Sequence, residues 1–280
     1  MPQQTFNSIE TGLSLRTKLN ANFAELYSLF ANNATQTFNF DATTIPSLAL
    51  WLDAADSNTL FDSVAGGSPV TTNGATIARW KDKSPFNLDA TQSVENSKPI
   101  LMKSLINGKN CIRLDGINDY LTSNLNLNGS TAFTCYMVCK GAGTSPVISF
   151  GYRAGAGDGL FITANDFGYG ATLYAKSPFG VGSFSASTVM LKGILNGGRY
   201  LTVYQNETKS STLDGYHVNH MPNYFYQGAP TLIGAIGAAV GSIYKYGAGD
   251  YCEILVFTSE LTPLQRQSVE LYLNQKWAIF

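Results

Sequence analysis

Most of the chain alternates short β-branched and aromatic runs with turn-forming residues. The runs span 48–54, 75–82, 109–115, 132–140, 146–151, 159–164, 199–207, 230–237 and 250–257. Gly, Asn, Asp or Pro occupies most of the gaps between them, which is typical of strands joined by tight turns. No helical periodicity separates the runs, so a parallel βαβ arrangement is disfavoured. The pattern predicts a mainly β protein, an antiparallel β-sandwich or jelly roll.

The segment before the first run has a helical period instead. Its apolar seam has heptad spacing with one polar member, at Leu15, Leu19, Asn22, Leu26 and Leu29. Phe23, Tyr27 and Phe30 widen the apolar face. This spacing predicts a helix over residues 14–30. Two heptads are too short to be stable alone in water, so the helix needs apolar surface elsewhere. It packs on its own β domain, or it mediates self-association or docking into a larger assembly.

A second helix is predicted at the end of the chain. Thr262 can cap it, Pro263 suits the first helical position, and Gln265 completes a capping box. Five residues give the helix an apolar side, which we expect to lie against the sandwich: Leu264, Val269, Leu271, Tyr272 and Leu273. The polar stretch that ends at Pro46 indicates a linker. We therefore divide the chain into a helical segment (1–33), a linker (34–46) and a β domain (47–280).

Composition excludes several classes of partner. Lys and Arg number 18 against 19 Asp and Glu, so the chain lacks the basic surface that nucleic-acid binding requires. No apolar run approaches the roughly 20 residues needed to span a bilayer, and the first residues do not resemble a signal peptide. We expect neither nucleic-acid binding nor membrane insertion.

The four cysteines lie in or beside predicted strands, at Cys111, Cys135, Cys139 and Cys252. Cys135 and Cys139 share a strand face but lie about 13 Å apart, too far to bridge each other. No pair has zinc-finger spacing. We expect free, buried thiols.

Several motifs, in order along the chain, resemble the concanavalin A-like or laminin-G-like lectin domains of bacteriophage structural proteins. They are LALWLDAADSNTLFD, ARWKDKSPFNLDATQ, CIRLDGINDYL, AFTCYMVCK and CEILVFTSELTPLQRQSVELYLNQKW, within residues 47–280. Separately, FNSIETGLSLRTKLNANFAELYSLF is similar to an N-terminal segment shared by phage tail, baseplate and fibre proteins. The resemblance implies attachment to other virion proteins through residues 1–46. It also implies a homo-oligomer, typically a trimer, that folds in the host bacterial cytoplasm and is located in the virion.

Catalysis is not expected. Hydrolytic relatives of this fold place paired carboxylates on one strand face, and no Glu-x-Asp-x-x-Glu run is present. The nearest candidates, Asp250 and Glu253, have an odd separation that predicts opposite strand faces. For Glu253 a structural role is the favoured interpretation. His217 and His220 give only a weak zinc signal, and we name no catalytic residue.

One turn offers oxygen ligands for calcium. Asp115, Asn118 and Asp119 lie within DGINDY, and calcium takes six to eight oxygens. The same residues are ordinary hairpin-turn chemistry, which is the alternative interpretation. No other cofactor is expected.

Two segments combine aromatic rings with amides, as sugar-binding sites do. The first contains Asn219, Asn223, Tyr224, Phe225 and Tyr226, and the second contains Asn165, Tyr169 and Tyr174. Alternatively, these aromatic residues fill the core or a protomer interface. Trp51, Trp80 and Trp277 lie inside regular segments and are expected in the core.

Three functions remain. The first is a non-enzymatic virion fibre or tail protein whose lectin-like domain attaches to host-surface glycans. The second is a purely structural capsid decoration or head-fibre protein without a ligand. The third is a glycan depolymerase, which the missing carboxylate pair disfavours.

Overall fold

A computed structural model describes the backbone of residues 40–279 except 128–131, 142–145, 154–156, 164–165, 170–172, 177–187, 197–199, 206–207, 215–229 and 240–241. The side chains of residues 151–229, 238–242 and 244 are not described. The chain divides into two compact units, Met1–Asp41 and Ala42–Phe280. Because the description begins at residue 40, the predicted helix over residues 14–30, with its heptad positions, lies outside the described residues.

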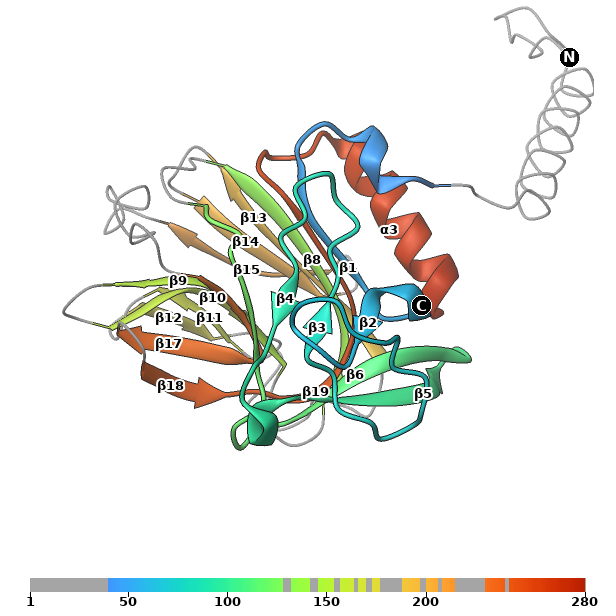
Figure 1. Ribbon diagram of the computed structural model, residues 1–280. Helices are drawn as coiled ribbons and strands as arrows, with labels where there is room; N and C mark the ends of the chain where they lie inside the picture. The colour runs from blue at the N-terminus through green and yellow to red at the C-terminus, as the bar shows by residue number, and fades with distance from the viewer. Residues whose placement is uncertain are drawn as a thin grey trace, which may run out of the picture. The chain divides into compact units, whose positions relative to one another are not determined.

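The second unit is a sandwich of two antiparallel sheets (Figure 1). The first sheet has the order β15 (Thr208–Asp214), β14 (Tyr200–Gln205), β13 (Thr188–Asn196), β8 (Phe133–Gly141), β19 (Ala248–Phe257), β6 (Lys109–Asp115), β5 (Ile100–Ile106). β1 (Leu48–Asp53) also pairs with β19, beyond the stretch that β6 occupies. The predicted fold class, a mainly β antiparallel sandwich, is confirmed.

The second sheet has the order β12 (Leu173–Lys176), β11 (Asp166–Tyr169), β10 (Gly157–Thr163), β9 (Val147–Arg153), β16 (Thr231–Ile233), β7 (Leu121–Ser123), β4 (Ala90–Thr91), β3 (Arg79–Trp80), β2 (Leu60–Phe61). A separate hairpin joins β17 (Ala235–Ala239) to β18 (Ser242–Tyr246). Short 3-10 turns are η1 (Ala42–Thr44), η2 (Ser57–Thr59) and η3 (Glu95–Ser97).

Two predicted strands differ from the structure. Within residues 75–82 only β3 is a strand, because the preceding backbone changes partner at each residue: Ile77 N–H donates to Pro99, and Ala78 N–H donates to Phe61. Residues 230–237 split at Gly234, whose φ of +85° ends β16 before β17 begins. A positive φ of this kind favours glycine.

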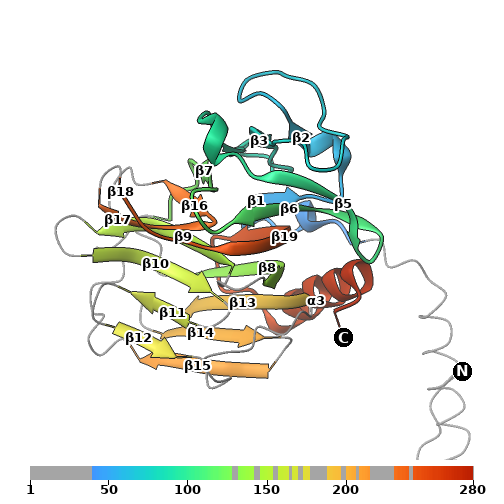
Figure 2. The same cartoon turned by 90° about the horizontal axis from the view of Figure 1, so that it is seen from below.

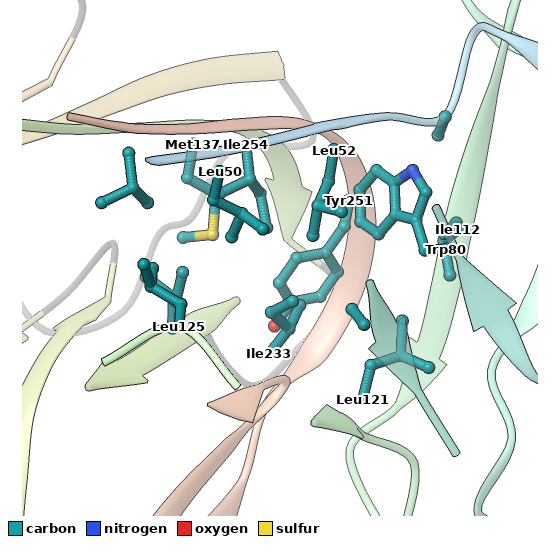
Figure 3. Packing of buried hydrophobic residues seen from close by; sticks show 14 of the residues in the cluster. Leu50, Leu52, Trp80, Ile112, Leu121, Leu125, Met137, Ile233, Tyr251 and Ile254 are labelled. Carbon is teal, nitrogen blue, oxygen red and sulfur yellow. The ribbon is translucent and has the colours of Figure 1, made fainter. Parts of the chain in front are cut away.

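The core lies between the sheets (Figure 3). Leu50, Leu52 and Ile254 project from the first sheet toward Leu121 and Ile233 of the second. Tyr251 crosses this layer, and its hydroxyl accepts a 2.7 Å hydrogen bond from the backbone N–H of Val147 in β9. All three tryptophans are buried, but only Trp80, at 0% exposure, belongs to this layer. Trp51 at 8% and Trp277 at 1% contact Glu253 on the outer face of the first sheet.

A β-bulge in β19 changes which residues face outward. The register against β8 shifts between Tyr251 and Glu253, and both Tyr251 and Ile254 belong to the core. Asp250 and Glu253 consequently both point to the outer face of the first sheet. The prediction that they lie on opposite faces was wrong, because it assumed an unbroken alternation that a bulge interrupts.

The helix α3 (Pro263–Trp277) covers that outer face (Figure 2). Its capping box forms as predicted: Thr262 Oγ1 accepts from the Gln265 N–H at 3.3 Å, and the Gln265 side chain accepts from the Thr262 N–H at 2.9 Å. Val269, Leu273 and Trp277 are the apolar residues it buries. Among the described residues, no helix has the length and apolar character needed to cross a membrane.

Two of the five residues predicted to form the inner apolar side of α3 face outward instead. Leu264 is 76% exposed and Leu271 is 41% exposed. They lie seven residues apart, which is two helical turns, so they share a face, and Val269 and Leu273 occupy the opposite one.

Candidate functional site

The outer face of the first sheet holds a buried polar cluster around Glu253. The Glu253 carboxylate accepts hydrogen bonds from the indole N–H of Trp51 at 2.8 Å, the indole N–H of Trp277 at 2.7 Å and the hydroxyl of Tyr272 at 2.7 Å. Lys276 Nζ lies 2.8 Å from its second oxygen. Glu253 is 0% exposed, so its charge is held entirely by these protein groups.

Asp53 extends the cluster to the loops. Its two carboxylate oxygens lie 2.7 Å from Lys276 Nζ and 3.0 Å from Lys83 Nζ. Lys83 also lies 3.1 Å from Asp56, and its ammonium sits over the Trp51 ring at 4.5 Å from the centroid. The cluster thus joins β1, β19, α3 and the loop after β3.

This geometry supports a structural role for Glu253. Burial raises its pKa, and the neighbouring negative charge of Asp53 raises it further. A raised carboxyl pKa is also what a general acid needs. However, four donors already surround this carboxylate, and no part of its surface is exposed to a substrate.

The second carboxylate of the depolymerase hypothesis is also paired. Asp250 forms a two-point contact with Arg113 on β6, at 2.7 Å from Nε and 3.0 Å from Nη2. Arg113 lies directly opposite Asp250 in the β6–β19 register. The bulge therefore brings two carboxylates to one face, where each is held by its own structural partners.

The predicted calcium turn is tightly hydrogen-bonded to its own backbone. One oxygen of Asp115 accepts from the N–H groups of Ile117, Asn118 and Asp119 at 2.8, 3.2 and 3.3 Å. Asp119 accepts from the Asp115 N–H at 3.1 Å. Burial raises the pKa of Asp115, but these backbone donors outweigh it and hold that pKa below its ordinary value. The turn chemistry accounts for these residues, and calcium binding remains an untested prediction.

Within the part of the chain that the structure describes, no group of three or more His, Cys, Asp or Glu side chains is arranged to hold a metal ion. His217 and His220 lie outside the described residues.

Most of the predicted sugar-binding residues also fall outside the described part. This applies to Asn165, Asn219, Asn223, Tyr224, Phe225 and Tyr226. The backbone places Tyr169 on β11 and Tyr174 on the neighbouring β12, where Tyr169 pairs with Leu173 and Tyr174 pairs with Gly168. These positions lie at the β12 edge of the second sheet.

The described residues do bring one aromatic pair to the surface. Tyr120 and Tyr246 are both half-buried, with ring centroids 6.2 Å apart and planes inclined by 48°. Tyr120 ends the turn between β6 and β7, and Tyr246 ends β18. Neither hydroxyl forms a hydrogen bond with the described residues.

Three backbone features fix this pair. The Tyr120 N–H donates to the Ser97 carbonyl at 3.3 Å, and the Tyr120 carbonyl accepts from the Gln92 side chain at 3.1 Å. Behind Tyr246, the Gly247 N–H donates to the Gly234 carbonyl at 2.9 Å. A Cβ on Gly234 would lie 1.9 Å from Leu114 Cδ2, so any other residue there would have to displace the buried Leu114 side chain.

Exposed apolar and charged side chains continue the surface. Ile117 is 73% exposed in the same turn as Tyr120, and Val94 is 56% exposed next to η3. Lys245 is exposed beside Tyr246. We call Ile117, Tyr120 and Tyr246 the Tyr120–Tyr246 surface. Figure 1 shows η3 and the β17–β18 hairpin at the same lower end of the sandwich.

Sequence reasoning missed this surface. Tyr120 closes DGINDY, where the carboxylates are the local signal, and Tyr246 lies 126 residues later, so no local motif contains both tyrosines. A local search for aromatic residues next to amides cannot join two tyrosines so far apart. The one local signal was the GINDY turn, which places an aromatic residue directly after polar turn residues.

Comparison with known proteins shows only distant similarity. No protein-family model and no curated protein matches the chain. The binding domain of botulinum neurotoxin serotype D aligns with a TM-score of 0.49 and 13% identity, over 82% of this chain and 51% of that one. Trypanosoma rangeli sialidase aligns with a TM-score of 0.46 and 14% identity, over 84% of this chain and 34% of that one.

A third similar structure is the binding domain of Paraclostridial Mosquitocidal Protein 1, with a TM-score of 0.47 and 12% identity over 73% of this chain and 51% of that one. The chain thus spans about half or less of the length of these proteins. At such scores and identities the similarities assign no function.

Proposed function

We propose that this protein is a non-enzymatic phage virion protein whose β-sandwich attaches to glycans on the host surface. Residues 47–280 carry the lectin-like motifs, and residues 1–46 resemble a phage attachment segment. In this proposal residues 1–46 bind other virion proteins and assemble the chain as a homo-oligomer, a trimer by the resemblance. The protein folds in the host bacterial cytoplasm and then remains on the virion.

The observation that carries glycan binding is the Tyr120–Tyr246 pair. Sugar-binding sites use an aromatic face to stack on the apolar face of a pyranose, with polar groups at the rim for its hydroxyls. Both tyrosines are partly exposed, and their hydroxyls have no partner among the described residues. The Asn118 amide lies two residues before Tyr120 in the same turn and offers such a rim group.

An open surface of this kind binds a single sugar weakly. Several copies on one virion raise the effective concentration of the second and later contacts, so avidity replaces tight single sites. A weak single site is therefore consistent with a protein that acts as an oligomer.

A purely structural role is the second candidate. The exposed Leu264 and Leu271 on α3 favour it, because they offer an uncovered apolar face that a virion neighbour could bury. A depolymerase is less well supported, since Asp250 and Glu253 are both occupied by structural partners.

An array of purified bacterial capsular polysaccharides, lipopolysaccharides and teichoic acids, probed with the labelled full-length protein, separates these functions. An adhesin binds a restricted set of polysaccharides and releases no reducing ends from them. A depolymerase releases reducing ends. A structural protein binds none of them, even as the intact oligomer.

The oligomer is tested in parallel with Leu19→Asp and Leu26→Asp. We expect both variants to lose oligomerisation and virion incorporation, and to bind polysaccharide with reduced avidity. A variant that stays oligomeric would contradict the assembly role of residues 1–46.

A further inference from the structure

Two of the four cysteines lie against each other beneath the protein surface. The Sγ atoms of Cys111 on β6 and Cys252 on β19 are 3.4 Å apart, and both residues are 0% exposed. Both are free thiols in the structure. The sequence suggested only free buried thiols and gave no reason to pair these two.

The strand register brings these residues together. β6 and β19 are antiparallel, and Tyr251 lies opposite Ile112 at the last residue of the ladder. Continuing that register by one residue puts Cys252 opposite Cys111. Residues directly opposite each other in an antiparallel pair have Cα atoms about 4.5 or 5.5 Å apart, which lies within the range that a disulfide spans.

The position in β19 also favours movement of one sulfur toward the other. Cys252 lies in the bulge, at the point where β19 leaves β6 and begins to pair with β1. An S–S bond is about 2.05 Å long, so the sulfurs must approach by roughly 1.4 Å. Cys252 has no directly paired residue in the β1, β6 or β8 registers, although its carbonyl accepts from the Ala54 N–H at 3.0 Å, and an unpaired bulge residue can supply that adjustment.

We propose that Cys111 and Cys252 are a reduced thiol pair during folding and form a cross-strand disulfide when the assembled protein meets a small-molecule disulfide oxidant. One thiolate attacks the oxidant disulfide, forms a mixed disulfide and releases one small thiol. The second cysteine thiolate then attacks the bound protein sulfur, forms the Cys111–Cys252 bond and releases the second small thiol. The two cysteines lose two protons and two electrons, and the oxidant disulfide is reduced to two thiols.

Burial controls the rate of this reaction. Burial raises the pKa of the Cys252 thiol, and the adjacent Cys111 raises it further, so the reactive thiolate is scarce in the closed protein. Because both residues are fully buried, the oxidant must reach the pair through a local opening of the protein. Oxidation is therefore slow in buffer, and a urea concentration too low to unfold the protein accelerates it.

The bond would stabilise the sandwich. It joins residues 141 positions apart in sequence, and long closed loops constrain the unfolded chain most in the chain-entropy description. The inference does not depend on glycan binding, because it concerns the durability of the domain and not its ligand.

The test incubates the full-length protein with oxidised glutathione and counts free thiols after denaturation. We expect the count to fall from four to two, the mass to fall by two hydrogen atoms, and peptide mapping to link Cys111 with Cys252. The urea midpoint of the oxidised protein should rise. Cys135→Ser is the matched control: it removes a buried thiol of β8 and should still form the bond.

Cys111→Ser should keep its three thiols under the same conditions. If that variant does not fold, peptide mapping of the wild-type protein still decides the question. Retention of all four thiols after incubation in mild urea, or linkage of any other pair, would overturn the proposal. Loss of two thiols in folded Cys111→Ser would overturn it equally.

Discussion

The indole N–H of Trp277 donates a 2.7 Å hydrogen bond to Glu253, which fixes the last turn of α3 on β19. Trp51 of β1 donates to the other oxygen of the same carboxylate at 2.8 Å. One buried carboxylate thus connects two strands and the C-terminal helix. The carboxylate that the sequence offers as a catalytic candidate serves here to attach a helix to a sheet.

Replacing Glu253 by Gln tests this role. The variant loses the ion pair with Lys276 and turns an amide NH₂ toward groups that are themselves donors. Removing one partner of a buried charged pair costs about 3 kcal/mol, so we expect the free energy of unfolding in urea to fall by about that amount. The exposed Glu95→Gln is the matched control and should not change the midpoint measurably. A Glu253→Gln protein as stable as the wild type would contradict the structural role.

Asp119 predicts a pH dependence of stability. Burial and the nearby Asp115 charge raise its pKa from 3.8 to about 6 in the folded protein. The protonated form is therefore favoured by folding, and its contribution to stability is full below about pH 4 and is lost as the pH rises through about 6. Urea midpoints between pH 4 and 7 should fall more steeply for the wild type than for Asp119→Asn.

In Asp119→Asn the amide oxygen can still accept from the Asp115 N–H, so the turn is retained. The difference between the two pH curves isolates this carboxyl from Glu253, whose raised pKa contributes with the same sign. Parallel curves for the two proteins would show that Asp119 does not titrate in this range.

Gly234→Ala should be strongly destabilising. Its added methyl group would meet Leu114 Cδ2 at 1.9 Å, in a backbone with φ of +85°. Gly74→Ala is the matched control, since its φ is +80° and nothing lies within 4 Å of the added atom. The free energy of unfolding of the control should fall by about 1 kcal/mol, which is the cost of alanine in a left-handed conformation. That of Gly234→Ala should fall by at least twice as much. Equal losses would mean that close packing at Gly234 is unimportant.

Removal of calcium should leave the sandwich unchanged. The Asp115 carboxylate is already satisfied by three backbone N–H groups, so the turn needs no cation to hold its shape. Thermal unfolding in excess EGTA and in millimolar calcium should give the same midpoint. A midpoint that rises with calcium concentration would revive the calcium interpretation, because a ligand that binds only the native state stabilises it.

Local patterns were enough to predict the fold class and the last helix. The Thr262, Pro263 and Gln265 signals depend on neighbours within one turn, and the structure shows the cap they predict. The inner side of α3 was less predictable, because Leu264 and Leu271 are apolar yet exposed. Hydrophobicity alone does not say which side of a helix meets the sheet.

The motifs behind the lectin resemblance are largely structural. In KDKSPFNLD the Asp82 carboxylate accepts from the backbone N–H groups of Trp51, Ser84 and Leu88, each at 2.8 Å. Its role depends on a strand 31 residues earlier, which no local pattern reveals. The faces of Asp250 and Glu253 were mispredicted because a bulge interrupts the strand alternation. The Tyr120–Tyr246 pair was not predicted because it depends on a contact between residues far apart in the sequence.

We propose that Tyr120 and Tyr246 form the sugar-binding surface of this protein. The most direct measurement is the affinity of the full-length protein for a polysaccharide it binds on the array, compared among wild type, Tyr246→Ala and Tyr246→Phe. We expect Tyr246→Ala to weaken binding about tenfold, about 1.4 kcal/mol, with Tyr246→Phe close to wild type, because stacking needs the ring more than the hydroxyl. Unchanged affinity in Tyr246→Ala and in Tyr120→Ala would contradict the account.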